Sequence, residues 1–393
     1  MGRFIAELGR DRPSCVEPQR GGQAVTGSPQ SNRSKPLYQG TGVTFSHRVR
    51  TGRFEQLQCR VRIERKYFKM SAPEAMHRIV ETNGIRMHIA EQGTGPTVLL
   101  CHGFPECWYS WRHQLSALAA NGFHAVAPDM RGYGQTDAPR EIDRYTLLHM
   151  VGDMLGLLDA LGIAQAVIAG HDWGAPVAWH AAQLRPDRFR AVIGLSVPFR
   201  ARGPVRPTSV MPRSDDAIWY QPYFQEPGVA EAELDQNVRT SFRIGRINVS
   251  GDAPPRSHPV GMVQRYGGLF ARVPPRPPPL PSWLTEADVD YYTSEFTRTG
   301  FRGGLNWYRN IDRNWELLAP FDGVPITVPA LYIAGDRDPV VKFPGMDRHI
   351  ADLPKFALQL RDMITLSGCG HITQEERPVE VNAAMIGFIR DLP

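Results

Sequence analysis

The chain has 393 residues, of which 42% are hydrophobic and 22% charged, the composition of an ordinary globular protein. Its formal net charge of +5 comes from the first 69 residues, where 14 Lys and Arg stand against 5 Asp and Glu, so the remainder is mildly acidic. This balance excludes the basic surface that a nucleic-acid-binding domain needs, and because no apolar run approaches the roughly 20 residues that span a bilayer, the sequence also predicts no membrane span.

Residues 1–69 show no sustained helical or strand periodicity and are rich in Gly, Ser, Gln and Arg. Such a segment buries too little apolar surface to offset the entropy lost on ordering, so we expect a disordered basic extension. Patterned sequence begins directly after Met70. Our hypothesis is that Met70 is the natural start and that the extension reflects an upstream start; a functional basic tail is the alternative.

The next region alternates between strand and helix patterns. His77–Glu81 and Arg86–Glu91 flank an Asn-Gly pair and predict a β-hairpin. Short apolar runs suited to strands buried on both faces follow at Thr97–Cys101, Phe123–Ala127, Ala166–Ala169, Ala191–Leu195, Ala330–Ile333 and Met363–Leu366. Helices are predicted over Tyr145–Leu161, after Gly174 and over Val379–Ile389. This order predicts an α/β fold with a mostly parallel sheet and helices on both faces.

The alternation breaks between residues 199 and 320. Prolines are dense there, and those between Pro274 and Pro281 predict a stiff polyproline connection. Helical patterns reappear at Ala230–Phe242 and Thr285–Thr297. We therefore expect residues 199–320 to form a helical cap, or lid, inserted between two parts of the core, residues 70–198 and 321–393.

The strongest local motif is Gly170-His171-Asp172-Trp173-Gly174, which follows a predicted strand and precedes a predicted helix. A nucleophile between small residues at such a turn is typical of the nucleophile elbow, which lifts the central side chain above the sheet. Here that side chain is Asp172, a carboxylate that needs no base to activate it and can form an ester by attacking a saturated carbon. An Asp that only caps the following helix is the alternative.

Two further motifs supply the partners of this nucleophile. His102-Gly103-Phe104-Pro105 ends an apolar strand, where the oxyanion-hole loop of such folds lies, so the backbone N–H groups of Phe104 and Trp173 are the predicted donors. His371 follows the strand Met363–Leu366 and is the predicted base, since the partners follow in the order nucleophile, acid, His. The acid is expected after the preceding strand, where we choose Asp338, with Asp336 as the second candidate.

These motifs, in this order, resemble the soluble epoxide hydrolases of the α/β-hydrolase superfamily. The similarity runs from about His77 to the C-terminus and includes the stretches HGFPECWYSWRHQ, DMRGYGQTDAP, GHDWGAPVAW, YFQEPGVAEAELD, GFRGGLNWYRN and CGHITQEERP. It implies an α/β-hydrolase fold with a helical cap and a cis bond before Pro105. It also implies detoxifying conversion of epoxides to vicinal diols through an ester of Asp172.

The resemblance also assigns two tyrosines of the lid, Tyr220 and Tyr308, to the epoxide oxygen. A phenol can donate a hydrogen bond and then a proton to the alkoxide that ring opening leaves. Without the family, each tyrosine would read as a packing residue with a satisfied hydroxyl. Haloalkane dehalogenases also carry an Asp nucleophile followed by Trp, but a halide needs no proton, and position 104 is Phe here, not the Asn that many of them use.

The remaining expectations concern substrate, cofactors and location. Aromatic residues near the motifs, Trp219 and Trp307 above all, together with Pro105, are predicted to line a site for a small apolar epoxide and water. The five cysteines form no metal-ligand or disulfide pattern, so we expect no metal, no organic cofactor and a cytoplasmic protein. The oligomeric state, a homodimer included, is left open. The alternatives are a haloalkane dehalogenase and a catalytically silent, hydrolase-like receptor.

Overall fold

The computed structural model describes residues 74–254, 260–272 and 278–393. The expectations for residues 1–69, and for the part of the polyproline connection at 273–277, lie outside the described residues.

The centre of the molecule is an eight-stranded sheet with the order β1-β2-β4-β3-β5-β6-β9-β10. β1 is antiparallel to β2 and β2 to β4, whereas the other neighbours are parallel. The strands are β1 Met76–Thr82, β2 Ile85–Gln92, β3 Thr97–Cys101, β4 His124–Pro128, β5 Ala166–His171, β6 Phe189–Leu195, β9 Ile326–Gly335 and β10 Ala357–Leu366. The predicted mostly parallel α/β sheet is therefore confirmed, and the predicted short runs all lie within or overlap its strands.

The hairpin of β1 and β2 turns at the predicted Asn-Gly pair. Asn83 has a φ of 45° and Gly84 a φ of 75°. Positive φ at both central residues is the requirement of a type I′ turn, whose twist matches the twist of the two strands. This turn chemistry explains why the hairpin could be recognised in the sequence.

Helices cover both faces of the sheet, and strand residues alternate between the two layers. Leu99 packs in the same cluster as the helices α2 Leu147–Ala160 and α3 Gly174–Leu184. Its neighbours Val98 and Leu100 pack with α1 Arg112–Ala120 and α12 Pro378–Arg390. Because successive strand side chains point to opposite faces, strands covered on both sides are apolar almost throughout, as β3 is after its first residue, Thr97.

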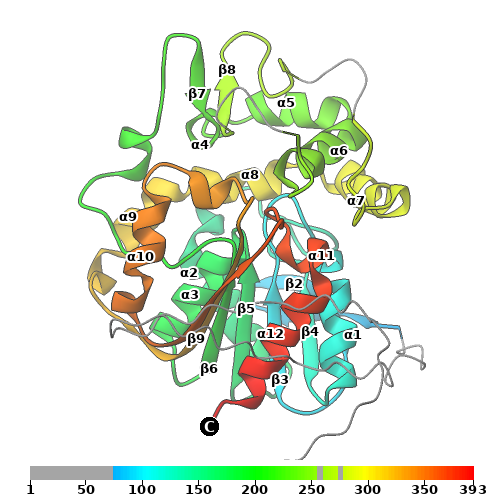
Figure 1. The fold of residues 1–393 in the computed structure, drawn as a ribbon, viewed down its shortest axis with the longest axis vertical. Coiled ribbons are helices and arrows are strands. Elements are labelled where there is room, and N and C mark those ends of the chain that lie inside the picture. Colours follow the sequence, from blue (N-terminus) through cyan, green and yellow to red (C-terminus); the bar gives the residue numbers. More distant parts are fainter. Residues whose placement is uncertain (1–73, 255–259, 273–277) are drawn as a thin grey trace, which may run out of the picture. The chain divides into compact units, whose positions relative to one another are not determined.

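Residues 196–325, between β6 and β9, are called the insertion here. Figure 1 shows its helices and its small sheet above the ends of the strands. Its elements are η4 Pro207–Val210, β7 Ala217–Trp219, α4 Tyr220–Tyr223, α5 Val229–Gln236, α6 Val238–Val249, β8 Met262–Gln264, α7 Glu286–Thr299, α8 Arg302–Arg309, α9 Ile311–Leu317 and η5 Ala319–Phe321. The pair β7–β8 was not predicted.

The helical pattern at Ala230–Phe242 corresponds to two helices in the structure, α5 and α6. Asn237 separates α5 from α6 with a φ of −150°, and its side chain accepts a hydrogen bond from the N–H of Thr240. Asn is a strong N-cap residue, so it begins a new helix instead of continuing the old one. The helix predicted over Thr285–Thr297 is present as α7, with Thr285 as its N-cap.

Buried ion pairs join the insertion to the core. Arg112 of α1 contacts Glu375 at 2.5 Å and Asp288 of α7 at 3.1 Å. Arg246 of α6 lies 3.6 Å from Glu375 and 3.8 Å from Glu106. We call these five residues the polar joint; each is buried or nearly so, and removal of one member would leave an uncompensated charge.

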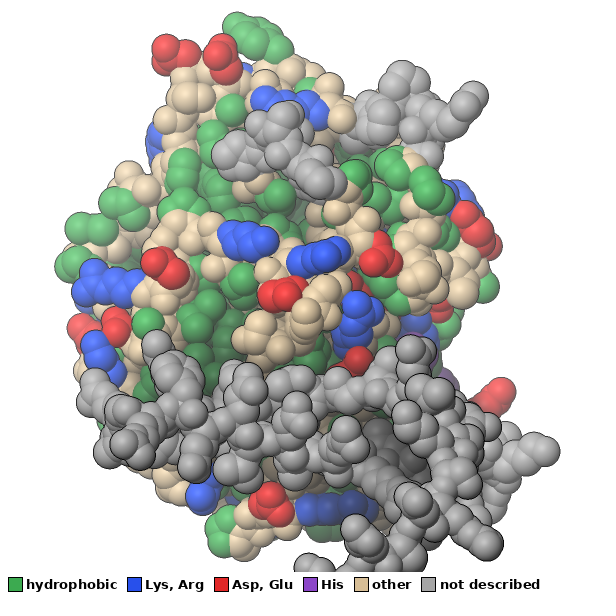
Figure 2. Space-filling model, in the orientation of Figure 1, with side chains coloured by type: hydrophobic (Ala, Val, Ile, Leu, Met, Phe, Trp, Pro, Cys, Tyr) green, Lys and Arg blue, Asp and Glu red, His purple; other side chains and the backbone are tan. Residues whose placement is uncertain are grey.

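The outer surface carries charges of both signs. On the face shown in Figure 2, Lys and Arg side chains are interspersed with Asp and Glu. None of the described helices combines the length and apolar character needed to cross a membrane.

Candidate active site

Asp172 occupies a strained turn between β5 and α3. Its φ of 49° lies in the left-handed region, which side chains rarely adopt and which marks functional turns. A Cβ on Gly170 would lie 2.0 Å from the carbonyl oxygen of Gly174, and a Cβ on Gly174 would lie 2.0 Å from that of Cys101. Only glycine fits at these two positions, so the predicted elbow is present and its side chain projects above the sheet.

The loop after β3 approaches this carboxylate from one side. The backbone N–H of Phe104 donates to Asp172 Oδ1 over 2.8 Å, and the bond between Phe104 and Pro105 is cis. Gly103 permits this approach, since a Cβ there would lie 2.5 Å from the same oxygen. The ring of His102 helps to hold the loop by accepting from the N–H of Met130 at 2.9 Å.

His371 lies between Asp172 and Asp338. Its Nε2 is 3.4 Å from Asp172 Oδ2, and its Nδ1 is 3.1 Å from Asp338 Oδ1. Asp338 follows β9 and is fully buried, whereas the second candidate, Asp336, is exposed and accepts a hydrogen bond from the N–H of Gly368. Of the two acids considered, the structure brings only Asp338 to the imidazole.

Ser196 is a further member of this group that the sequence analysis missed. Its hydroxyl donates to Asp338 Oδ2 over 2.5 Å and lies 2.8 Å from His371 Nδ1, while its φ is 67°. Tyr332 fixes the turn by donating to the carbonyl oxygen of Ser196. The missed signal is positional: Ser196 directly follows β6, at the sheet edge where Asp172 and Asp338 follow β5 and β9.

A second missed pair supports the main chain of His371. The ring of His171 donates from Nε2 to the carbonyl oxygen of His371 over 2.8 Å. Its other nitrogen, Nδ1, lies 2.8 Å from Glu106 Oε1, and both side chains are fully buried. The HGFPE and GHD motifs thus position His371 as well as Asp172.

The electrostatics of His371 and Asp338 favour an ion pair. Burial opposes the charged imidazole, but the carboxylates of Asp338 and Asp172 outweigh it and hold the pKa of His371 well above its usual range. Burial likewise opposes ionisation of Asp338, yet His371 and the hydroxyl of Ser196 lower its pKa. The imidazole of the free enzyme therefore holds its proton tightly.

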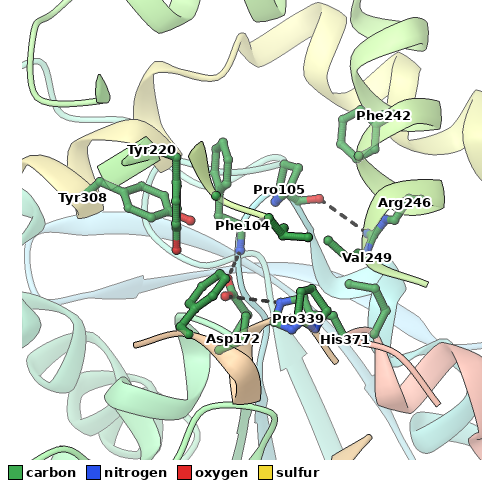
Figure 3. Close-up of a pocket in the computed structure, with 16 residues that line it drawn as sticks. Phe104, Pro105, Asp172, Tyr220, Phe242, Arg246, Val249, Tyr308, Pro339 and His371 are labelled. Carbon is green, nitrogen blue, oxygen red and sulfur yellow. Dashed lines mark hydrogen bonds and ion pairs between the residues drawn. The ribbon is translucent and has the colours of Figure 1, made fainter. Parts of the chain in front are cut away.

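Tyr220, at the start of α4, and Tyr308, near the end of α8, approach Asp172 from the insertion. Their ring centroids are 5.8 Å apart, and Figure 3 shows both hydroxyls directed toward the carboxylate of Asp172. Burial, together with the charge of Asp172, raises the pKa of both phenols, so both keep their protons. The neighbouring Tyr223 instead donates to Glu233.

Two cavities meet at Asp172. The smaller, of about 210 Å³, is lined by Phe104, Pro105, Tyr308 and His371 (Figure 3). The larger, of about 390 Å³, is lined by Trp173 and by residues of α3, α9 and the segment 199–211. Asp172, Tyr220, Val340 and Phe343 line both. A molecule held at Asp172 can therefore extend in two directions.

The expectation that Trp219 and Trp307 line the site is wrong, because neither borders these two cavities. Trp307 is fully buried and donates from Nε1 to the carbonyl oxygen of Arg131. Adjacent helical residues point in directions about 100° apart, so Tyr308 faces the cavity while Trp307 faces the core. Trp219 packs against Phe343, with ring centroids 4.7 Å apart.

Among the described residues, no three His, Cys, Asp or Glu side chains gather as a metal-ligand group. The chemistry that the site can perform is that of a carboxylate nucleophile, a histidine–carboxylate pair, two phenols and at least one backbone donor, arranged around one point.

Comparisons with known proteins find relatives that match most of the chain. A family model described as alpha/beta hydrolase fold matches residues 96–378. Epoxide hydrolase A of Mycobacterium tuberculosis is 44% identical over 82% of this chain and 99% of its own length. Epoxide hydrolase 3 of Siraitia grosvenorii is 44% identical over 80% of this chain and 98% of its own. The solved structure of an epoxide hydrolase from an endophytic Streptomyces superposes with a TM-score of 0.78 at 46% identity, covering 81% of this chain and 96% of that one.

Proposed function

The chain belongs to the epoxide hydrolases of the α/β-hydrolase superfamily, and we propose that it converts epoxides to vicinal diols through an ester of Asp172. The observation that carries the mechanism is the convergence of Tyr220 and Tyr308 on the nucleophile (Figure 3). A carboxylate on one side of a cavity and two phenols on the other match the two ends of a carbon–oxygen bond that is to be broken.

In the first step, Asp172 attacks one epoxide carbon. Oδ1 accepts the N–H of Phe104, so Oδ2, which lies 3.4 Å from His371 Nε2, forms the new carbon–oxygen bond while Oδ1 becomes the ester carbonyl oxygen. The bond between that carbon and the ring oxygen breaks. Tyr220 and Tyr308 hydrogen-bond the departing oxygen, and one of them gives it a proton, which completes the first hydroxyl of the diol.

In the second step, His371 takes a proton from a water that attacks the carbonyl carbon of Asp172. Asp338 orients the imidazole and stabilises its positive charge. The negative charge that develops on Oδ1 is held by the N–H groups of Phe104 and Trp173. The bond between the Asp172 carbonyl carbon and Oδ2 then breaks, so Oδ2 leaves with the diol and the oxygen of the water takes its place in the carboxylate. Of the two protons of the water, one completes the second hydroxyl of the diol and the other returns His371 to its protonated state.

Ester formation itself prepares His371 for this role. In the free enzyme the charges of Asp338 and Asp172 both raise the pKa of His371. The ester is neutral, so the contribution of Asp172 disappears and the pKa of the imidazole falls. The imidazolium then gives its proton to the phenolate that ring opening leaves, which restores the tyrosine and frees the base only after a substrate has been captured.

The alternatives fit the site less well. A dehalogenase would not need two phenols beside its nucleophile, because a halide leaves without a proton. A silent receptor would not need the arrangement of Asp172, His371 and Asp338, each within 3.4 Å of the next.

We further propose that residues 199–320 serve as a lid over residues 70–198 and 321–393. A cytoplasmic location also stays a proposal, in keeping with free, buried thiols at Cys101, Cys107 and Cys369.

Trapping the ester tests the mechanism. His371→Gln removes the base but leaves Asp172, so incubation with styrene oxide should add the mass of one epoxide to the peptide that contains Asp172. The wild-type protein should turn the same substrate over without accumulating the adduct, and Asp172→Ala should show neither adduct nor turnover. Absence of an adduct on Asp172 in a folded His371→Gln protein would overturn the scheme.

A further inference from the structure

Ser196 forms a turn whose main chain is fixed by its neighbours. Its N–H donates to the carbonyl oxygen of Ile333 over 2.8 Å, and its own carbonyl oxygen accepts the hydroxyl of Tyr332 at 2.7 Å. The N–H of Val197 donates to the carbonyl oxygen of Leu195 over 2.8 Å, which closes a three-residue turn around a φ of 67°. Such turns with positive φ are rare and strained, and strained residues cluster at functional sites. The edge of the sheet therefore fixes the direction of this serine side chain.

The hydroxyl of Ser196 lies within the pair formed by His371 and Asp338. It donates its one proton to Asp338 Oδ2 over 2.5 Å, so it meets His371 Nδ1, 2.8 Å away, as an acceptor. Nδ1 is farther from the carboxylate itself, at 3.1 Å from Oδ1 and 3.2 Å from Oδ2. Hydrogen bonds between a charged N–H and a carboxylate usually measure about 2.7–2.9 Å. The imidazole and the carboxylate are thus held apart, with the hydroxyl as the nearest acceptor.

Both oxygens of Asp338 accept hydrogen bonds from groups other than the imidazole. The N–H of Val340 donates to Oδ1 over 2.8 Å, while the hydroxyl of Ser196 donates to Oδ2. Burial opposes ionisation of Asp338, but His371 and these two donors lower its pKa. Each donor draws negative charge away from the side that faces Nδ1, which weakens the hold of the carboxylate on the imidazole proton.

We propose that Ser196 is a positioning residue that limits the basicity of His371, so that the imidazole can lose its proton once the ester of Asp172 has formed. Without the hydroxyl, the carboxylate of Asp338 would close on Nδ1 and act on it with its full charge. His371 would then keep its proton to higher pH, and water would attack the ester only above that pH. The inference rests on the proposed function and assigns Ser196 to its second step alone.

Other titratable and charged groups also face His371 and Asp338. Asp172 lies 3.4 Å from Nε2, on the other side of the imidazole (Figure 3), and is neutral once it has become the ester. The rest come from the elements packed around the site: His171 of β5, Tyr220 of α4, Arg246 of α6, Tyr308 of α8, Tyr332 of β9, Cys369, and Glu376 of α11 Thr373–Glu376. A substitution of Ser196 leaves all of them in the protein, so a change in the titration of His371 reports on the hydroxyl.

Two substitutions remove the hydroxyl but differ in their effect on the backbone. Glycine suits a φ of 67°, so Ser196→Gly relieves the strain of the turn, whereas Ser196→Ala keeps it. In single-turnover reactions with styrene oxide, both should move the pH midpoint of ester hydrolysis upward by about one unit, since loss of a hydrogen bond to a charged group changes a pKa by about that much or more. The plateau rate at high pH should be retained. Ester formation, which does not use His371 as a base, should stay within about threefold of wild type.

Tyr332→Phe is the matched control. It removes the hydrogen bond that fixes the carbonyl oxygen of Ser196 but leaves the serine hydroxyl in place. Its melting temperature should fall, while its pH midpoint should stay within about 0.3 units of wild type. If Ser196 only stabilised the turn, Tyr332→Phe would shift the midpoint as much as Ser196→Gly, and that result would overturn the proposal.

A titration of the free protein supplies a readout that does not depend on turnover. In Asp172→Asn a neutral side chain takes the place of the ester, and the NMR signal that disappears on adding His371→Gln belongs to the imidazole. This signal should titrate at higher pH when Ser196→Gly is added, and an unchanged or lower midpoint would sink the proposal. A wild-type protein that forms no ester with styrene oxide would instead contradict the proposed function, while the titration would still decide the role of Ser196.

Discussion

The hydroxyls of Tyr220 and Tyr308 above Asp172 can be removed one at a time. Tyr220→Phe and Tyr308→Phe delete only the hydroxyl, and the packing of Tyr308 should persist, because its ring contacts Trp173, Phe104 and Phe224 with centroid distances of 5.1, 5.3 and 5.1 Å. The tyrosine is 4% exposed. The double variant then lacks both described phenols that line the smaller cavity.

The expected loss of alkylation rate follows from the proposal that both hydroxyls hydrogen-bond the same departing oxygen. A hydrogen bond to a charged group contributes about 1.5–3 kcal/mol, so each single variant should slow alkylation about 10- to 150-fold. In a single variant the remaining phenol still supplies the proton. The double variant has no proton source at the oxygen, so its loss should exceed the product of the single losses.

Stopped-flow tryptophan fluorescence under single-turnover conditions follows both steps, because Trp173 adjoins the nucleophile. The alkylation phase should slow in the variants, while hydrolysis of the ester should change little. Tyr223→Phe is the matched control, since its hydroxyl contacts Glu233 and not the site. The reasoning is refuted if the double variant alkylates within tenfold of the slower single variant, or if ester hydrolysis alone is slowed.

Two further predictions test the base and the elbow. Ester hydrolysis needs neutral His371, so its rate should rise with pH. Asp338→Asn removes a charge that raises the pKa of His371, so the midpoint of this rise should move to lower pH and the plateau rate should be lower. A midpoint that moves to higher pH in single-turnover profiles would contradict the assignment. Gly174→Ala places a Cβ 2.0 Å from the backbone oxygen of Cys101 and should lower the melting temperature or prevent folding. The control is Gly387→Ala in α12, where an added Cβ meets no neighbouring atom within 4 Å, so the change should be neutral or stabilising by up to about 1 kcal/mol. Equal melting temperatures for both variants would show that the turn tolerates a side chain.

The core of the fold could be predicted because its sequence signals are local. β3 and β5 are short and mostly apolar, and the hairpin turn has the residues that its φ values require. The pair β7–β8 has three residues in each strand and lies in a segment rich in Pro and Gly, so no periodicity could reveal it. The break at Asn237 was visible only as a capping residue inside a helical pattern.

The site residues likewise divide into those that the sequence could predict and those that it could not. Asp172, His371 and Asp338 follow strand ends, where the topology of a parallel sheet gathers side chains, and Ser196 could have been found by that rule. Tyr220 came from the resemblance alone, because no local pattern distinguishes a phenol that faces a cavity from one that packs. Trp307 was misassigned since the rotation of α8 depends on tertiary packing.

The polar joint has a consequence for how substrate range and chemistry can vary. It ties α6 and α7 to the loops that hold Asp172 and His371, and charges at fixed separations tolerate little sliding. The segment 199–211 forms a wall on the side of the larger cavity. We expect this wall to accept changes in width and charge while the reaction centre keeps its geometry, so that a new substrate can be acquired without a new catalyst.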